Sequence, residues 1–158
     1  VKYNQTPYAS IIWSTAYGLA KKIITNSEVN SYLCSSYAWD TAVNFIQNNS
    51  TAKNYATSIE GFNGNWNPQA VKDTSGNVIK PAGTSQQLNT GLTTQFCNIF
   101  DMGGNEAEFT TELNPGTSET VVLRGGNYYD DLPAGNRWDN VSGSADIDYG
   151  FRATLFLK

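Results

Sequence analysis

The sequence predicts an α+β protein, in which two amphipathic helices come first and short strands follow. Apolar residues recur at helical spacings between Pro7 and Ile24 and again after Ser35. A short apolar run at Val121 and an alternating apolar segment at the C-terminus are typical of strands. With 158 residues and 13% aromatic side chains, the chain has the size of one domain with its own core, and we expect a single domain over residues 1–158.

The first helix is expected from about Pro7 to Ile24. Its apolar positions are spaced by three, four and seven residues and are Ile11, Ile12, Ala16, Leu19, Ala20 and Ile23. Thr6 is a suitable N-cap, Pro7 fits the first helical position, and Asn26 can end the helix.

The second helix is expected to begin after Ser35 or Ser36, since either side chain can form the N-cap. Trp39, Val43 and Ile46 then lie on one face. The polar run Asn48-Asn49-Ser50 is expected to end this helix.

Residues 51–95 contain mostly Gly, Asn, Ser, Thr and Pro with isolated aromatic residues. A segment this long is either an irregular folded region held by side chains or ions, or largely mobile, and the aromatic residues favour the first. Beyond it, Val121–Leu123 is predicted to be a buried strand and Phe151–Leu157 the terminal strand.

Composition excludes several kinds of chemistry. Because the chain has no histidine, it cannot hold a Ser-His-Asp or Cys-His triad or an imidazole metal site, so any metal would need oxygen ligands. A net charge of −4 without a basic cluster argues against nucleic acid as a partner. No stretch has the length and apolar character of a membrane span, so we expect no membrane insertion.

The two cysteines leave two possibilities open. Cys34 precedes the second predicted helix and Cys97 lies far along the chain. They can form a disulfide in a surface protein, or remain two buried free thiols.

The segment Asn127–Tyr149 has the composition of a binding loop. Tyrosine and tryptophan offer large contact areas, and Asn, Asp and Ser offer adaptable hydrogen bonds, although ordinary solvated loops are also polar. We therefore predict that a ligand is bound by Tyr128, Tyr129, Asp130, Asp131, Asn136, Trp138, Asp139, Asn140, Ser142, Asp146 and Asp148.

Three strings in order carry a family likeness: Asn98-Ile99-Phe100-Asp101-Met102-Gly103-Gly104-Asn105-Glu106-Ala107-Glu108-Phe109, Val122-Leu123-Arg124-Gly125-Gly126-Asn127-Tyr128 and Gly150-Phe151-Arg152. With the two helices upstream, they resemble the formylglycine-generating-enzyme (sulfatase-modifying factor) family. The resemblance implies a C-type-lectin-like fold, with two helices flanking a small twisted antiparallel sheet and long irregular loops. It also implies that the terminal strand pairs with a strand near the start of the chain, so we expect one to be missing upstream of Val1.

The same resemblance argues against an enzyme. Active members carry two cysteines shortly after the Arg-Gly-Gly string, where this chain has Tyr128 to Gly135 without sulfur. The related iron enzymes need histidines, which are absent. We therefore predict a non-catalytic member.

A structural calcium ion is expected from the resemblance. Its ligands would be the Asp101 and Glu108 side chains and the carbonyls of Gly104 and Glu106, a set of oxygens that suits a hard cation. The alternative is that Asp101 is a turn residue and Glu108 a surface carboxylate.

The C-terminal segment also looks like the variable region of diversity-generating retroelement proteins, in which Asn codons become Tyr, Asp or Ser codons. This implies a protein or cell-surface ligand and a location that is extracellular or surface-displayed, on a bacterium or a phage particle. The alternative is a structural or carbohydrate-binding module of a larger surface protein. Trp138-Asp139-Asn140 is similar to the Trp-Asn-Asp string of sugar-binding lectins, but the order differs.

Overall fold

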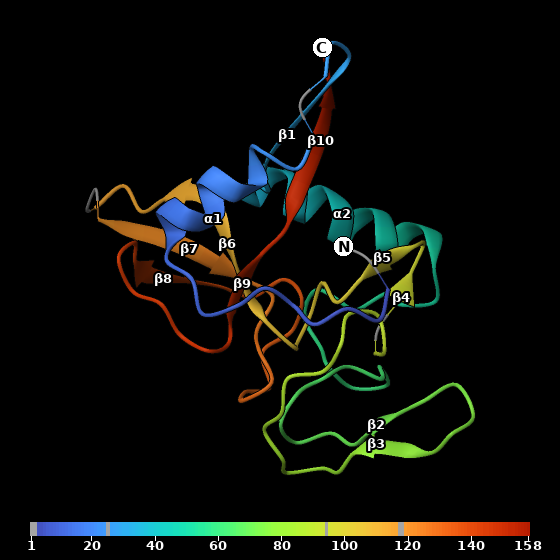
Figure 1. Cartoon of the computed structure of the whole chain (residues 1–158). Helices are drawn as coiled ribbons and strands as arrows, with labels where there is room; N and C mark the ends of the chain where they lie inside the picture. Colours follow the sequence, from blue (N-terminus) through green and yellow to red (C-terminus); the bar gives the residue numbers. More distant parts are fainter. Residues whose placement is uncertain (1–2, 25, 94, 117–118) are drawn as a thin grey trace.

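A four-stranded sheet with the strand order β8-β7-β6-β9 forms the centre of the molecule (Figure 1). The computed structural model describes residues 3–24, 26–93, 95–116 and 119–158. The strands are β6 (Ala107–Leu113), β7 (Thr120–Arg124), β8 (Arg137–Val141) and β9 (Tyr149–Phe151). β7 is antiparallel to β6 and β8, whereas β9 runs parallel to β6. The protein is therefore α+β, as predicted, with a mixed rather than purely antiparallel sheet.

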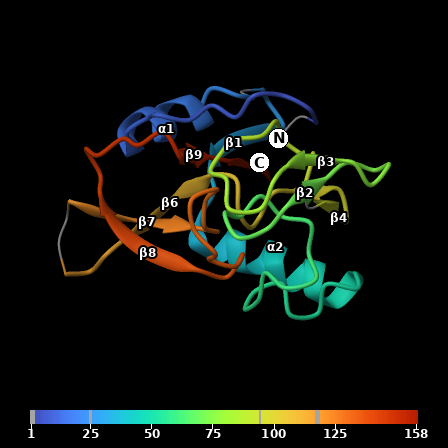
Figure 2. The ribbon, with the colours of Figure 1, turned by 90° about the horizontal axis from the view of Figure 1, so that it is seen from below.

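The two helices, α1 (Trp13–Ala20) and α2 (Ser36–Asn49), lie on opposite sides of this sheet (Figure 2). Because side chains alternate along a strand, Phe109 and Leu123 pack with Ala16 of α1. On the other face, Thr110 meets Ser36 of α2, with 3.2 Å between their hydroxyl oxygens. Neither helix has the length and apolar character of a membrane span, within the described residues.

Sequence analysis placed α2 correctly and made α1 too long. Ser35 is the N-cap of α2, and Trp39 lies on its buried face. α1 begins at Trp13 rather than near Pro7, because Ser10 has a φ of 59°, which lies outside the right-handed helical region. The Trp13 amide donates to the Ser142 carbonyl at 3.1 Å, and such tertiary contacts override helical propensity.

The terminal strand is divided between two sheets. β9 ends at Phe151, and β10 (Ala153–Leu157) pairs antiparallel with β1 (Val29–Leu33). β1 was not predicted, and it takes the place of the neighbouring strand expected upstream of Val1. The β1–β10 ribbon extends from the body of the molecule (Figure 1), and the last three apolar residues of β10 are exposed.

The described residues of this segment, 51–93 and 95, are folded, as the aromatic residues predicted. Tyr55 and Trp66 are fully buried, and two short hairpins are present: β2 (Val71–Lys72) with β3 (Val78–Lys80), and β4 (Gln95–Phe96) with β5 (Ile99–Phe100). Lys80 holds the region together from inside. Its ammonium group is buried and donates to the carbonyls of Trp66, Gln69 and Thr84 at 2.8–3.1 Å.

Both cysteines are free thiols. Cys34 is buried, whereas Cys97 is exposed. The expectation of two buried thiols therefore holds for Cys34 alone, and burial raises the pKa of the Cys34 thiol.

Candidate functional site

Two of the four residues predicted to bind calcium, Asp101 and Glu108, contact the guanidinium group of Arg152. Arg152 donates to both carboxylate oxygens of Glu108, with 2.7 Å between Nη2 and Oε1. It also donates to the carbonyls of Phe100 at 3.2 Å and Asp101 at 3.0 Å. Its other face lies over the Trp39 ring, 4.9 Å from the ring centroid.

The carboxylate of Asp101 binds the loop that contains Gly91 and Thr93. It accepts hydrogen bonds from the Gly91 amide at 2.7 Å and from the Thr93 hydroxyl at 2.6 Å. Asp101 has a φ of 47°, as expected for a turn residue, but it is buried. The Gly104 carbonyl accepts from the Glu106 amide at 3.0 Å.

This arrangement fits an internal guanidinium rather than calcium. Calcium needs six to eight oxygens around one point, but the Glu108 carboxylate is engaged by Arg152. In the described part of the chain, no group of three or more His, Cys, Asp or Glu side chains is placed to hold a metal ion. Nor is Glu108 a surface carboxylate, since it is 7% exposed.

The predicted ligand segment begins at a turn that only glycine can form. Gly125 and Gly126 have φ values of 90° and 72°. A Cβ atom at Gly125 would lie 2.6 Å from the Met102 carbonyl oxygen, and one at Gly126 would lie 2.4 Å from that of Leu132. The Arg-Gly-Gly string thus turns the chain sharply out of β7 into the loop.

The loop after this turn has a buried base. The Asn127 amide donates to the Asp130 carboxylate at 3.2 Å, and its side chain donates to the carboxylate of Asp148. The Asn127 side-chain oxygen in turn accepts from the Tyr129 amide at 2.8 Å. Tyr128 is only 4% exposed. Asn127, Tyr128 and Asp148 therefore shape the loop from below.

The tips of the same loops face solvent. Tyr129 is 48% exposed and Ile147 is 53% exposed, and Asp131 and Asp146 are also exposed. The centroid of the Tyr129 ring lies 4.5 Å from that of the buried Tyr128 ring, so the two rings pack against each other. We call Tyr129, Asp131, Asp146 and Ile147 the loop tips.

The other predicted ligand residues lie apart from the loop tips, on or beside β8. Trp138 is half-buried and packs with the α1 core cluster, so it supports the sheet. Asp139 accepts a hydrogen bond from Asn114, and Ser142 bonds through its backbone to Trp13 and Glu119. Asn136 accepts through its carbonyl from Arg124 at 3.0 Å. Asn140 accepts from the Val141 amide at 2.7 Å. Composition cannot distinguish these residues from the loop tips, because they differ only in that β8 pairs with β7 over Arg137–Val141.

Two buried acids lie below the loops. Burial is the main cause that raises the pKa of Glu106 to about 8, and Asp148 and Glu108 add like-charge repulsion. Burial also raises the pKa of Asp148 to about 6, with further repulsion from Asp146 and Asp130. Sequence analysis assigned only the carbonyl of Glu106 to a site and missed its side chain.

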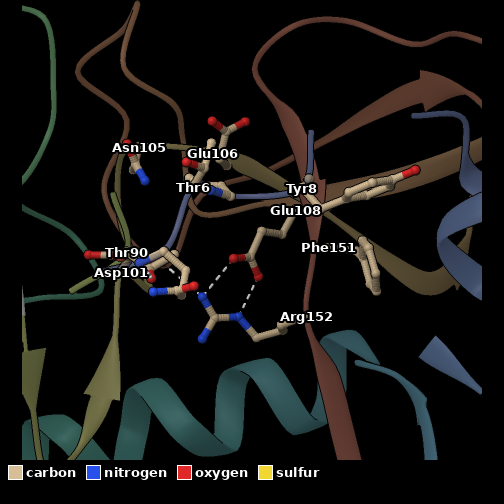
Figure 3. A pocket seen from close by; sticks show the side chains of 12 residues that line it. Thr6, Tyr8, Thr90, Asp101, Asn105, Glu106, Glu108, Phe151 and Arg152 are labelled. Carbon is tan, nitrogen blue, oxygen red and sulfur yellow. Dashed lines mark hydrogen bonds and ion pairs between the residues drawn. The ribbon is translucent and has the colours of Figure 1, made fainter. Parts of the chain in front are cut away.

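Glu106, but not Asp148, lines a pocket of about 190 Å³ (Figure 3). The segment before α1 forms one wall, and the start of β6 and the β9–β10 junction form the others. Its lining residues are Gln5, Thr6, Pro7, Tyr8, Thr90, Asp101, Asn105, Glu106, Glu108, Gly150, Phe151 and Arg152. Sequence analysis did not predict the contribution of the N-terminal segment, because only the tertiary fold brings it here.

The fold and loops together define an α+β scaffold that carries exposed polar loops on a buried base. No protein-family model matches the sequence, and no curated protein matches it. The structure is similar to Treponema denticola variable protein 1, with a TM-score of 0.56, 15% identity, and coverage of 84% of this chain and 49% of that one. It is also similar to CarF, with a TM-score of 0.63, 16% identity, and coverage of 95% and 67%. The likeness is one of fold, and the chain spans about half the length of variable protein 1.

Proposed function

We propose that this chain is a non-enzymatic ligand-binding domain with a C-type-lectin-like fold, and that its loop tips contact the ligand. The observation that carries the proposal is the division of one segment into a hydrogen-bonded base and an exposed surface. A fixed base lets exposed side chains change without disturbing the fold, which binding loops require.

The chemistry of the loop tips suits recognition of a protein or another cell-surface structure. Tyr129 presents an aromatic ring whose neighbour already restricts its motion, so little conformational entropy is lost on binding. Asp131 and Asp146, which are also exposed, add hydrogen-bond acceptors and negative charge. The ligand surface proposed here is smaller than the set predicted from sequence, because Tyr128, Trp138 and Asp148 support the fold.

We further propose that the chain is the variable protein of a diversity-generating retroelement, displayed on a bacterial surface or a phage particle. Two observations support this: the likeness of segment 127–149 to such variable regions, and the similarity in fold to a protein described as a variable protein. The resemblance to formylglycine-generating enzymes is compatible with a non-catalytic member that uses the same scaffold.

A second candidate is a structural module of a larger surface protein. The exposed apolar side chains of β10, Leu155, Phe156 and Leu157, favour this alternative, because such a strand is commonly covered by another part of a protein. The two candidates differ at the loop tips, which a purely structural module does not use.

The gene and its flanks test the retroelement proposal. We expect a reverse-transcriptase gene nearby and a near-copy of the 3′ end with adenines at the codons that vary. Sequencing the locus across many isolates should show variation at the codons of Tyr129, Asp131 and Asp146, and constancy at Gly125 and Gly126. A locus without the template copy, and identical in every isolate, would contradict the proposal.

A further inference from the structure

A second pocket, of about 290 Å³, opens beside the loop tips. Ile147 belongs both to the loop tips and to the wall of this pocket, and Tyr128, whose ring packs on that of Tyr129, lines it as well. The lining residues are Pro7, Ala9, Ser10, Gln87, Tyr128 and Ile147. The pocket therefore joins the loop tips to residues that lie outside segment 127–149.

The wall formed by residues 7–10 is held in place on both sides. Before it, the Thr90 amide donates to the Gln5 carbonyl at 2.9 Å. After it, the Trp13 amide donates to the Ser142 carbonyl at 3.1 Å. Because these hydrogen bonds fix the wall before a ligand arrives, little ordering of the chain is needed on binding.

The backbone of this wall departs from local preference at Ser10. Its φ of 59° lies in the left-handed region, which is uncommon for serine. The neighbouring Tyr8 packs edge to face on Phe151, with 6.4 Å between ring centroids (Figure 3). A backbone of this kind persists only where the surrounding structure fixes it, and such positions cluster where proteins contact ligands.

The lining of the second pocket is uncharged. Pro7, Ala9 and Ile147 present apolar side chains, and Gln87 adds one amide. The Gln87 Nε2 donates to Glu106 at 2.5 Å, whereas its side-chain oxygen accepts no hydrogen bond from the described residues. A charged group would find no ion-pair partner among the lining residues, so an apolar group is favoured. A volume just below the range of roughly 300–1,000 Å³ for drug-sized ligands suits a single side chain.

We propose that the second pocket receives one neutral, apolar side chain, of the size of leucine, from a protein bound at the loop tips. The proposed function supplies only the source of this side chain, which is a protein ligand. Residues 7–10 and Gln87 are then a constant part of the ligand surface, next to loop tips that differ between variants of the protein. The Gln87 side-chain oxygen is placed to accept a hydrogen bond from a backbone amide of the ligand.

The test is a titration of the ¹⁵N-labelled chain with N-acetyl-leucine methylamide, followed by ¹H–¹⁵N correlation spectra. We expect saturable shifts of the Gln87 side-chain amide and of the Ala9 and Ile147 backbone amides, with a Kd of about 1–10 mM. The glycine analogue, which lacks the side chain, and the lysine analogue, which carries a charge, should each bind about tenfold more weakly or worse. No saturable shift at these groups up to about 50 mM, or equal binding of the lysine analogue, would overturn the proposal.

Two variants test whether the probe binds in this pocket. Ala9→Arg places a long charged side chain at the wall and should abolish the saturable shifts, whereas Thr41→Arg, at an exposed position of α2, should leave them unchanged. Ile147→Asp, at an exposed loop tip, should weaken binding about tenfold or more, because it replaces an apolar wall by a charge. Thermal unfolding of each variant confirms that it is folded. Unchanged affinity in Ala9→Arg or in Ile147→Asp would contradict the proposal.

Binders from a library randomised at the loop tips separate this proposal from the proposed function. Adding Ala9→Arg to such binders should raise their Kd for the target protein about tenfold or more. Binders that keep their affinity would overturn the role of the pocket and leave the loop tips as the binding surface. A library without binders would instead contradict the proposed function, and with it a protein as the source of the side chain.

Discussion

Replacing Arg152 by alanine is expected to lower the free energy of unfolding by about 3–5 kcal/mol. The substitution leaves Glu108, which is 7% exposed, without its positive partner. It also removes the donor to the Phe100 and Asp101 carbonyls and the contact with Trp39. The loss should exceed that of a surface ion pair, because both charges are buried.

Urea denaturation measures this loss of stability. An ion pair at the surface provides the control. Arg137 pairs with Glu112 at the surface, so Arg137→Ala should cost at most about 1 kcal/mol. The double variant Arg152→Met with Glu108→Gln should recover part of the loss, since no uncompensated charge remains. An Arg152→Ala protein as stable as the wild type would show that the guanidinium does not hold this region.

Thermal unfolding of the wild type with and without calcium tests whether Arg152 or a calcium ion supplies the positive charge beside Glu108. If Arg152 supplies the positive charge, adding calcium or a chelator leaves the melting temperature of the wild type unchanged. A clear rise with calcium in the wild type would restore the metal expected from the family resemblance.

Replacing Lys80 by methionine is the second change with a large expected effect, a loss of about 2–4 kcal/mol. Methionine has a similar length, so the cost comes from the carbonyls of Trp66, Gln69 and Thr84, which lose their shared donor in a buried place. Lys72→Met is the matched control, because Lys72 lies in the same hairpin and is exposed.

Urea denaturation and limited proteolysis together locate the effect of Lys80→Met. We expect faster cleavage within residues 51–95, because the ammonium group ties three parts of this region to one another. If Lys80→Met and Lys72→Met are equally stable and equally resistant to protease, the buried ammonium is not what holds the region.

Sequence analysis predicted the elements that depend on local pattern. An N-cap at Ser35 or Ser36 was predicted from residue type, and the structure has Ser35. The buried face of α2 follows from spacing, and the buried strand at Val121–Leu123 from a short apolar run. It was wrong where contacts between distant residues decide the structure. β1 forms because β10 is available to pair with it, and α1 starts late because Ser10 has a left-handed φ and the Trp13 amide bonds to Ser142.

The candidate site shows the same division. Composition identified segment 127–149, because Tyr, Asp and Asn are concentrated there. It could not separate the exposed Tyr129 from the buried Tyr128, since adjacent residues of one type differ only in the direction that the turn gives them. The ion pair between Arg152 and Glu108 could not be predicted either, because 44 residues separate the two in the chain.

The most direct test of the proposed function is a selection for binding in which only the loop tips vary. In one display library, the codons of Tyr129, Asp131, Asp146 and Ile147 are randomised. A matched library randomises four exposed residues on one face of α2: Tyr37, Thr41, Asn44 and Asn48. Selected against the same folded target protein, the first library should yield folded binders with a Kd of about 1 μM or tighter, and the second should not. Binders recovered equally from both libraries, or loss of folding in most loop-tip variants, would contradict a ligand-binding surface at these loops.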